Sequence, residues 1–355
     1  MSFYLHGLGV AAPDHVLNRA DAIELARRVA CETDKQQRLV EVLHRRSGVE
    51  ERRTCVPYTE AFRWEGDPNG PTIAERTDWY ETHAAPLAIR STQAALADSG
   101  IAPAEVTHLV TVSCTGFEAP GVDLALIHEL GFSPDTQRVN VGFMGCHGAI
   151  NGLRVAGGLA AAEPDATVLL VATELCSIHY CFHWDNERVA GNALFADGSG
   201  AVIGRSTPPP DSAAKPWRLA ATGSRVLPHT QELITWRVRN HGFEMGLSAE
   251  LPGVIEETLG DWLPAWLERH GVAMNDVRSW AIHPGGPRIV SACRTALGLD
   301  ESATAASLAV LSEYGNMSSA TALFVMRRLR DEGAAAPCVA LGFGPGVVAE
   351  AALWV

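Results

Sequence analysis

GCHGAINGLRVA, residues 145–156, decides the expected fold because the chain contains a second stretch built like it. GNMSSATALFVM, residues 315–326, lies 170 residues later, and both begin with glycine, a polar residue and small residues before an apolar helical pattern. The same shift carries the strand-like run VLLVATE (168–174) onto CVALGFG (338–344). This self-similarity predicts a duplicated architecture of two similar halves.

The duplicated halves are expected to be α/β in class. Apolar runs typical of strands covered on both faces alternate with helical patterns, which indicates parallel sheets. We place the halves at residues 1–215 and 216–355, because the proline-rich polar stretch STPPPDSAAKP (206–216) lies between them. In such folds the site is expected where strand ends of both halves meet.

Composition excludes several classes of protein. The chain has 355 residues, of which 47% are hydrophobic and 19% charged, which is a globular composition. A formal charge of −13 argues against a nucleic-acid partner. No signal-peptide pattern and no membrane-length apolar stretch is present, so no membrane association and a cytoplasmic location are expected. The eight cysteines are scattered, so no disulfide framework is expected.

Cys146 is the candidate nucleophile. A thiol at a helix N-terminus is expected to have a lowered pKa, and a histidine partner would lower it further. The alternative is a small residue tolerated at a glycine turn. The repeat favours the nucleophile, because the shift places Asn316 at the counterpart of Cys146 and His283 at the counterpart of Ser113.

His283 and Asn316 are the candidate partners of the thiol. His283 lies in AIHPGGPR, directly after a predicted strand, and Asn316 lies between EYG and MSSA. As alternatives, the imidazole could donate to a loop carbonyl in a structural role, and asparagine could merely cap a helix. Together, imidazole and amide could stabilise a developing oxyanion.

The segment ELCSIHYCFH, residues 174–183, is a second candidate site, because its Cys176, His179, Cys181 and His183 could suggest zinc binding. Its spacing has no C-x-x-C pair and suits neither common zinc pattern. No metal site is therefore predicted, and a pocket or dimer-contact segment is the preferred interpretation.

Five motifs lie between about residue 100 and the end of the chain. They are GCHGAINGL around Cys146, ALFADGSGAVI around Phe195, AIHPGGPRIV around His283, EYGNMSSAT around Asn316, and GFGPGVVAE at 342–350. Together they resemble the type III polyketide synthases, the chalcone-synthase-like branch of the thiolase superfamily. The resemblance implies a homodimeric thiolase-like fold, layered α/β/α/β/α, that joins a starter acyl thioester to malonyl-CoA units and cyclises the product. It implies no cofactor.

The resemblance also implies roles for the three candidate residues. Cys146 would carry the acyl chain as a thioester. His283 and Asn316 would hold the malonyl thioester carbonyl and favour decarboxylation to an enolate that attacks the acyl-cysteine. These roles agree with the chemistry argued from the residues alone, because enolate and tetrahedral intermediate both place charge on an oxygen.

Cavity residues follow from the same resemblance. Phe195 matches an aromatic gatekeeper, and Met245 matches a second one, with Phe243 as the alternative. The remaining positions that the resemblance places around the cavity are Cys114, Thr115, Cys176, His179 and Ser318. Plant members of the family have hydroxylated residues at the positions of Cys114 and Cys176. The less polar thiols of this chain suggest a fatty or other apolar starter, as in bacterial alkylresorcinol or alkylpyrone synthases.

Arg46 is the one residue that the resemblance aligns with the basic residues that hold the CoA phosphates in the family. Its neighbours Arg45, Arg52 and Arg53 could form a phosphate patch or a solvated charged face. Delivery of the starter on CoA or on an acyl carrier protein is left open.

Two other functions compete with the polyketide synthase. A ketoacyl-ACP synthase III also uses Cys, His and Asn, but for one condensation; HPGG and GFGPG favour the polyketide branch. A catalytically silent scaffold that binds acyl thioesters is the third interpretation, and the intact set of three residues argues against it.

Overall fold

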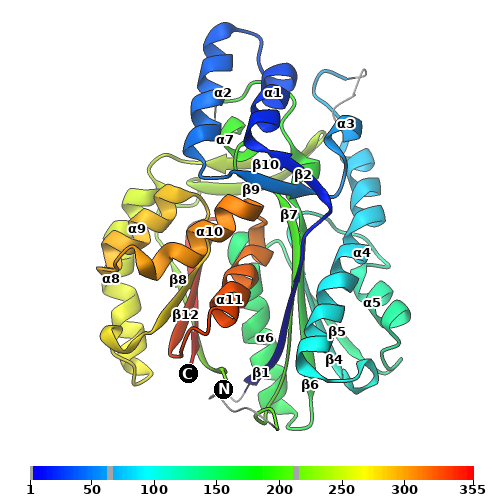
Figure 1. Ribbon diagram of the computed structural model, residues 1–355, viewed down its shortest axis with the longest axis vertical. Helices are drawn as coiled ribbons and strands as arrows, with labels where there is room; N and C mark the ends of the chain where they lie inside the picture. Colours follow the sequence, from blue (N-terminus) through cyan, green and yellow to red (C-terminus); the bar gives the residue numbers. More distant parts are fainter. Residues whose placement is uncertain (1–2, 62–66, 187, 211–215) are drawn as a thin grey trace.

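The computed structural model describes residues 3–61, 67–186, 188–210 and 216–355 (Figure 1). Its central feature is one nine-stranded sheet in the order β11-β12-β13-β8-β1-β7-β6-β4-β5. These strands are β1 (Phe3–Ala11), β4 (His108–Ser113), β5 (Gln137–Gly142), β6 (Thr167–Leu175), β7 (Asp197–Arg205), β8 (Arg218–Val226), β11 (Ser279–Ile282), β12 (Cys338–Gly344) and β13 (Val348–Trp354).

Two strand pairs and the helices complete the fold. The pairs are β2 (His15–Asn18) with β3 (Glu51–Thr54), and β9 (Ile234–Arg239) with β10 (Gly242–Leu247). The helices are α1 (Arg19–Ala30), α2 (Asp34–Arg46), α3 (Tyr58–Ala61), α4 (Ile73–Ser99), α5 (Val122–Leu130), α6 (Gly148–Ala162), α7 (Val189–Asn192), α8 (Leu251–Arg269), α9 (Pro287–Leu297), α10 (Ala305–Tyr314) and α11 (Thr321–Asp331).

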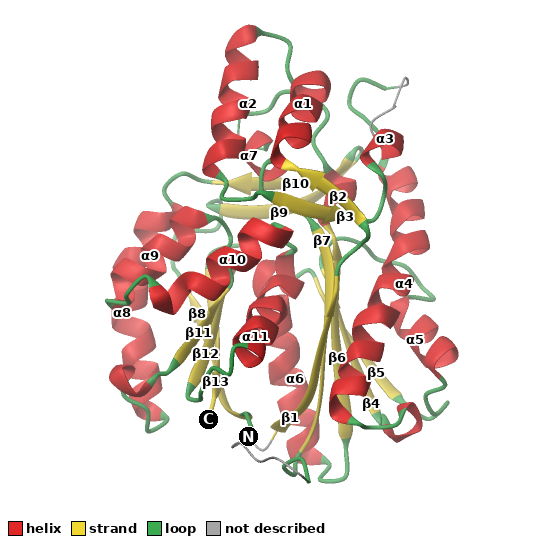
Figure 2. Ribbon diagram, viewed as in Figure 1, coloured by secondary structure: helices red, strands yellow, loops and turns green. Residues whose placement is uncertain are grey.

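The predicted five layers are confirmed. Helices α6 and α11 lie between the two halves of the sheet, whose inner faces and these helices share one hydrophobic core. Helices α4 and α5 cover the outer face of the N-terminal half, and α8 and α9 cover that of the C-terminal half (Figure 2). Every residue of β6 is buried, because alternate side chains face α4 and α6.

The sequence repeat has a structural counterpart. A 3-10 turn, η2 (Gly145–His147), leads into α6 and then β6, as η6 (Ser318–Ala320) leads into α11 and then β12. β4 and β6 are parallel neighbours, as are β11 and β12. The shift fails at β5, because it maps this strand onto residues 307–312, which lie within α10.

The expectation of parallel sheets is only partly correct. β1, β7, β8 and β13 run antiparallel to their neighbours, and β1 and β8 join the two halves through the pairs Phe3–Leu219 and Tyr4–Arg218. The short link between β12 and β13 permits only an antiparallel connection. The predicted boundary at residue 215 lies outside the described residues.

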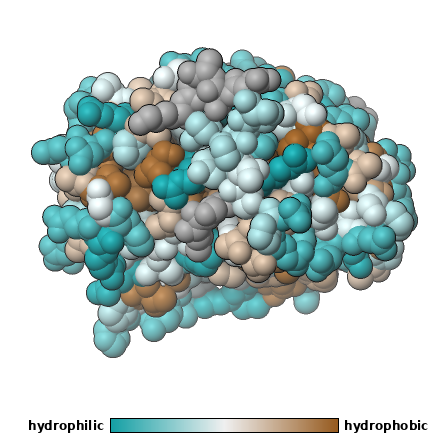
Figure 3. Space-filling model, turned by 90° about the horizontal axis from the view of Figure 1, so that it is seen from below, coloured by the Kyte–Doolittle hydropathy of each residue, from teal (hydrophilic) through white to brown (hydrophobic). Residues whose placement is uncertain are grey.

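The surface and the thiols add three observations. Seen from below, the end that carries both termini, the molecule shows mainly hydrophilic residues with scattered hydrophobic ones (Figure 3). Within the described ranges, no helix is long and apolar enough to cross a membrane. All eight cysteines are free thiols.

Candidate active site

Cys146 lies in η2, immediately before α6, as the sequence pattern indicates. The preceding Gly145 has a φ of +77°, and a Cβ on it would clash with Pro345 of the GFGPG turn. Glycine is therefore required next to the nucleophile by both backbone conformation and space. The residue Cys146 keeps part of its surface exposed, whereas the groups around the sulfur desolvate the thiol itself.

Backbone hydrogen bonds tie Asn316 to the Phe195 segment. Its N–H donates to the Leu194 carbonyl at 2.9 Å, and its carbonyl accepts from the Ala196 N–H at 2.9 Å. The side-chain oxygen accepts from the Ser318 N–H at 2.9 Å, so the amide NH₂ remains the donating end, and a side-chain hydrogen bond links Asn316 to Cys146. The helix-cap interpretation is wrong, because Met317 and Ala320 occupy the N-cap positions of η6 and α11 and the Asn316 oxygen accepts within a turn two residues long.

His283 follows β11, and its backbone N–H donates to the Leu341 carbonyl at 2.7 Å. The side chain is 1% exposed, yet neither ring nitrogen has a hydrogen-bond partner among the described residues. A structural histidine bonded to a loop carbonyl is therefore the wrong interpretation. Buried polar atoms without partners are rare in folded proteins, so this imidazole is suited to receive a ligand.

Burial sets the protonation states of the thiol and the imidazole. It raises the pKa of Cys146 to about 12, which hydrogen bonds from Ser318 and Asn316 oppose and the nearby Glu174 carboxylate reinforces. It lowers the pKa of His283 to about 3, with a further contribution from His147. The substrate-free site holds a neutral thiol and a neutral imidazole, and the lowered thiol pKa expected from the helix N-terminus is wrong because desolvation dominates.

Ser318 and Cys114 connect Cys146 to a buried carboxylate that sequence reasoning missed. The Ser318 Oγ lies 3.8 Å from the Cys146 Sγ and 3.1 Å from the Cys114 Sγ, which is 3.3 Å from Oε1 of Glu174. Glu174 is fully buried at the end of β6 and also accepts from the Cys114 N–H at 3.0 Å and from the Thr115 hydroxyl at 2.7 Å. Its position in the ELCS motif was the available signal.

We expect Glu174→Ala to destabilise the protein by about 3 kcal/mol or more, because it leaves buried donors of Cys114, Thr115 and Ser319 without their acceptor. Glu174→Gln keeps one acceptor oxygen and should cost about half as much. Urea denaturation measures both, with exposed Glu129→Ala as control. A Glu174→Ala protein within about 1 kcal/mol of the wild type would contradict this role.

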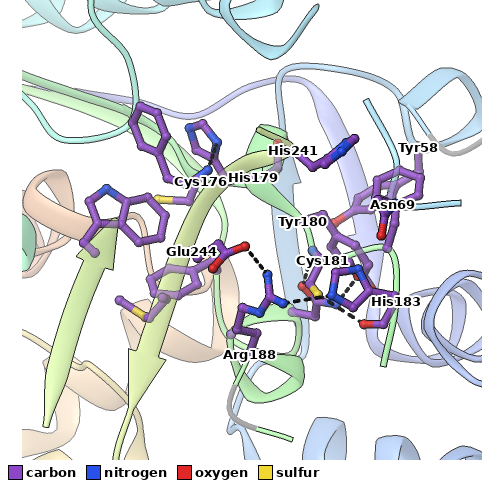
Figure 4. Close-up of a pocket in the computed structure, with 18 residues that line it drawn as sticks. Tyr58, Asn69, Cys176, His179, Tyr180, Cys181, His183, Arg188, His241 and Glu244 are labelled. Carbon is purple, nitrogen blue, oxygen red and sulfur yellow. Dashed lines mark hydrogen bonds and ion pairs between the residues drawn. The ribbon is translucent and has the colours of Figure 1, made fainter. Parts of the chain in front are cut away.

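The predicted gatekeepers line one cavity of about 170 Å³ with two of the predicted cavity residues (Figure 4). Phe195 and Met245 line it together with Cys176 and His179, and so does Phe243, the alternative second gatekeeper. Figure 4 shows Cys176 and His179 at one end, and Tyr58 and Asn69 at the other. The structure thus brings these predicted residues together at one cavity. The three catalytic candidates and the predicted cavity residues Cys114, Thr115 and Ser318 do not line it.

Hydrogen bonds hold an aromatic wall in place at this cavity. His179 donates from Nε2 to the Thr115 carbonyl at 2.6 Å and accepts at Nδ1 from the Phe243 N–H at 3.1 Å, while the two rings stack at 4.1 Å. Burial lowers the pKa of His179 to about 3, so it is neutral. Trp236, which no motif marked, donates to the Cys114 carbonyl at 2.6 Å and packs against Phe243.

The arginines expected near the site have different roles. Arg52 is 2% exposed and donates to the Asn192 carbonyl at 2.6 Å and the Ala193 carbonyl at 2.7 Å, so it supports the Phe195 segment and is neither a phosphate ligand nor a solvated charge. Arg46 is exposed at the end of α2 and does not line the cavity.

The remaining two arginines of that group form ion pairs, Arg45 with Glu41 at 2.6 Å and Arg53 with Glu51 at 3.9 Å. In the part of the chain that the structure describes, no group of His, Cys, Asp or Glu side chains could hold a metal ion.

Sequence comparisons cover both halves. The family models for the N-terminal and C-terminal domains of chalcone and stilbene synthases match residues 3–208 and 218–354. The alpha-pyrone synthesis polyketide synthase-like Pks18 of Mycobacterium tuberculosis is 34% identical, with 99% of this chain and 90% of that protein covered. The 1,3,6,8-tetrahydroxynaphthalene synthase of Streptomyces peucetius is 32% identical, with 96% and 89% covered.

Solved structures agree with these matches. PKS-I of the brown alga Ectocarpus siliculosus superimposes with a TM-score of 0.93 at 29% identity, covering 100% of this chain and 98% of that one. The 1,3,6,8-tetrahydroxynaphthalene synthase of Streptomyces coelicolor gives 0.89 at 31% identity, covering 99% and 98%. The resemblance read from the five motifs is confirmed: the chain belongs to the chalcone and stilbene synthase family, and it is a type III polyketide synthase with a thiolase-like fold, an acyltransferase of the decarboxylative condensing type.

Proposed function

We propose that Cys146, His283 and Asn316 load an apolar acyl starter, extend it with malonyl units and release a pyrone or resorcinol-type product. The observation that carries the proposal is the buried His283 imidazole, which has no hydrogen-bond partner among the described residues and interacts electrostatically with His147, the residue after Cys146. The similarity to Pks18, an alpha-pyrone synthesis polyketide synthase-like protein that is 34% identical, supports a pyrone.

Loading begins with attack of the Cys146 sulfur on the thioester carbonyl of the starter. The neutral imidazole of His283 accepts the thiol proton as the S–C bond forms. The carbonyl of the tetrahedral intermediate re-forms as the bond to the carrier sulfur breaks, and His283 returns the proton to that departing sulfur. The acyl group is then held on Cys146 as a thioester.

Extension uses the same imidazole with the Asn316 amide. With malonyl-CoA bound, the N–H of His283 and the NH₂ of Asn316 donate to its thioester oxygen, CO₂ leaves, and the electron pair forms an enolate. The enolate carbon attacks the acyl-Cys146 carbonyl, the C–S bond breaks, and a β-ketoacyl-CoA and the Cys146 thiolate result. Each step uses thioesters and side chains, so we propose that no cofactor is needed.

The family uses CoA thioesters, and we propose Arg46 as a contact for their phosphates. We also propose that residues 1–215 and 216–355 act as two halves of one catalytic unit. The eight free thiols support a cytoplasmic location.

We propose that two copies of the chain assemble at β5. This strand ends the nine-stranded sheet, and exposed apolar side chains lie along and just after it, among them Val139, Phe143 and Met144. An unpaired edge of this kind favours pairing with a second copy. Sedimentation equilibrium should give twice the chain mass of 37.9 kDa, and Val139→Asp with Phe143→Asp should reduce it to the monomer. A monomeric wild type would contradict the assembly.

The small cavity should limit the length of the product, and this limit can be tested. At about 170 Å³ the cavity is smaller than most ligand pockets, and Trp236 forms part of its wall. We expect Trp236→Ala to shift products towards longer starters or more extensions, as measured by mass spectrometry with octanoyl-CoA or lauroyl-CoA and malonyl-CoA. Trp262→Ala on α8 is the control, since Trp262 does not line this cavity. An unchanged product pattern would contradict a limiting role for Trp236.

The same assay tests the proposed reaction. Octanoyl-CoA with malonyl-CoA should give a cyclised pyrone or resorcinol. A single β-ketoacyl product would instead assign the protein a ketoacyl synthase III-like activity.

A further inference from the structure

One face of α2 combines exposed apolar and cationic side chains. Leu39 and Val42 are 40% and 42% exposed, although both are branched apolar residues on adjacent turns. The same face, at helical spacing, presents four exposed cations: Lys35, Arg38, Arg45 and Arg46. We call these six residues the α2 face.

The α2 face is locally basic on an acidic protein. The two carboxylates of the helix, Asp34 and Glu41, lie along its edge, and Glu41 is engaged by Arg27 and Arg45, each at 2.6 Å. Lys35, Arg38 and Arg46 have no ion-pair partner among the described residues. Because the chain carries a formal charge of −13, an acidic partner would be repelled by much of the surface and attracted here.

The helix that carries this face packs against α7, and the turn after it lies close to the start of α9. Helix α7 lies beside α2 (Figure 1). The inner side of α2 packs Val40 against Val189 of α7, and α7 contributes Gly191 and Asn192 to the cavity wall. Past its C-terminal end, a Cβ on Gly48 would lie 2.9 Å from the Cγ of Pro287, four residues after His283. A partner seated on the α2 face is therefore close to the elements that hold the catalytic groups.

We propose that the α2 face docks an acidic, helical acyl carrier protein that delivers the starter as a phosphopantetheine thioester; this inference rests on the proposed function. Apart from Arg46, which we assign to the CoA phosphates, the cations from Lys35 to Arg45 spread over about 15 Å of helix, a length that suits a carrier helix better than compact phosphates. An apolar centre of Leu39 and Val42 inside a cationic rim has the composition of a protein interface.

Transfer of the acyl group from the carrier protein to Cys146 follows the same steps as loading from CoA. The Cys146 sulfur bonds to the acyl carbon, the bond from that carbon to the phosphopantetheine sulfur breaks, and His283 moves the proton from the Cys146 thiol to the departing phosphopantetheine thiol. The carrier protein leaves in its holo form.

The test compares two donors of one acyl group, octanoyl-CoA and the octanoyl form of an acyl carrier protein of bacterial fatty acid synthesis, with malonyl-CoA as extender. Lys35→Glu with Arg38→Glu, and separately Leu39→Ser with Val42→Ser, should lower kcat/KM for the carrier protein by about tenfold or more. The value for octanoyl-CoA should change less than about twofold. Arg269→Glu with Arg278→Glu is the matched control, since these exposed cations lie on α8 and before β11.

Direct binding of the holo carrier protein, measured by calorimetry on wild type and variants, separates this inference from the proposed function. Turnover of octanoyl-CoA without binding or use of the carrier protein would overturn the docking surface and leave the proposed function standing. Binding that the α2 variants weaken, with no product from either donor, would support the surface and overturn the function. Equal losses with both donors, or a changed oligomeric state in the variants, would also overturn the docking surface.

Discussion

Replacing Cys146 by alanine is expected to abolish product formation from octanoyl-CoA and malonyl-CoA, a loss of at least about 10³-fold in kcat. Alanine removes the only atom of that side chain that can hold the acyl group, and it preserves the small volume of the turn. The loss is measured by quantifying cyclised product by mass spectrometry under conditions where circular dichroism shows both proteins folded.

Cys114→Ser is the matched control for this loss. The Cys114 thiol lies in the same network, 3.1 Å from Ser318, but burial raises its pKa well above the ordinary value, with the Glu174 carboxylate adding to the increase. A serine keeps the hydrogen bonds, so this variant should retain most of the turnover. Equal turnover by Cys146→Ala and wild type would rule out the mechanism.

The second large effect concerns the two groups that stabilise the enolate. Cys146→Gln should still convert malonyl-CoA to acetyl-CoA and CO₂, because decarboxylation needs His283 and Asn316 but not the thiol. Adding His283→Ala or Asn316→Ala to this variant should lower acetyl-CoA formation by about 10²- to 10³-fold, the usual effect of losing one oxyanion donor. Chromatography of the CoA esters gives the rate.

Cys176→Ser in the Cys146→Gln protein is the control, since Cys176 lines the cavity and has no proposed contact with the malonyl carbonyl. Decarboxylation that persists unchanged after removal of both His283 and Asn316 would show that other groups stabilise the enolate.

Much of the fold was predictable because a duplicated chain repeats the same sequence pattern at a fixed spacing. The shift that aligns residues 145–156 with 315–326 identified η2 with α6 and η6 with α11, the paired elements at the centre of the five layers. The antiparallel strands were missed because an apolar run has the same composition in either direction. The failure at β5, whose counterpart is helical in α10, shows where the halves diverged.

The catalytic candidates were predictable for the same reason, since Cys146 and Asn316 occupy equivalent positions in the two halves. Glu174 and Trp236 were missed because their roles depend on contacts with Cys114, which is far from both in the sequence. The direction of the Cys146 pKa shift was also inaccessible, because it is set by burial, which appears only when the chain is folded.

The most direct test of the central claim is peptide mass spectrometry of the folded protein after incubation with octanoyl-CoA and no malonyl-CoA. The account predicts one octanoyl group on the peptide that contains Cys146, and none on the peptides that contain Cys114 or Cys176. It also predicts that malonyl-CoA removes this group as product forms. No acyl group on Cys146, or a stable acyl group on another cysteine, would contradict the account.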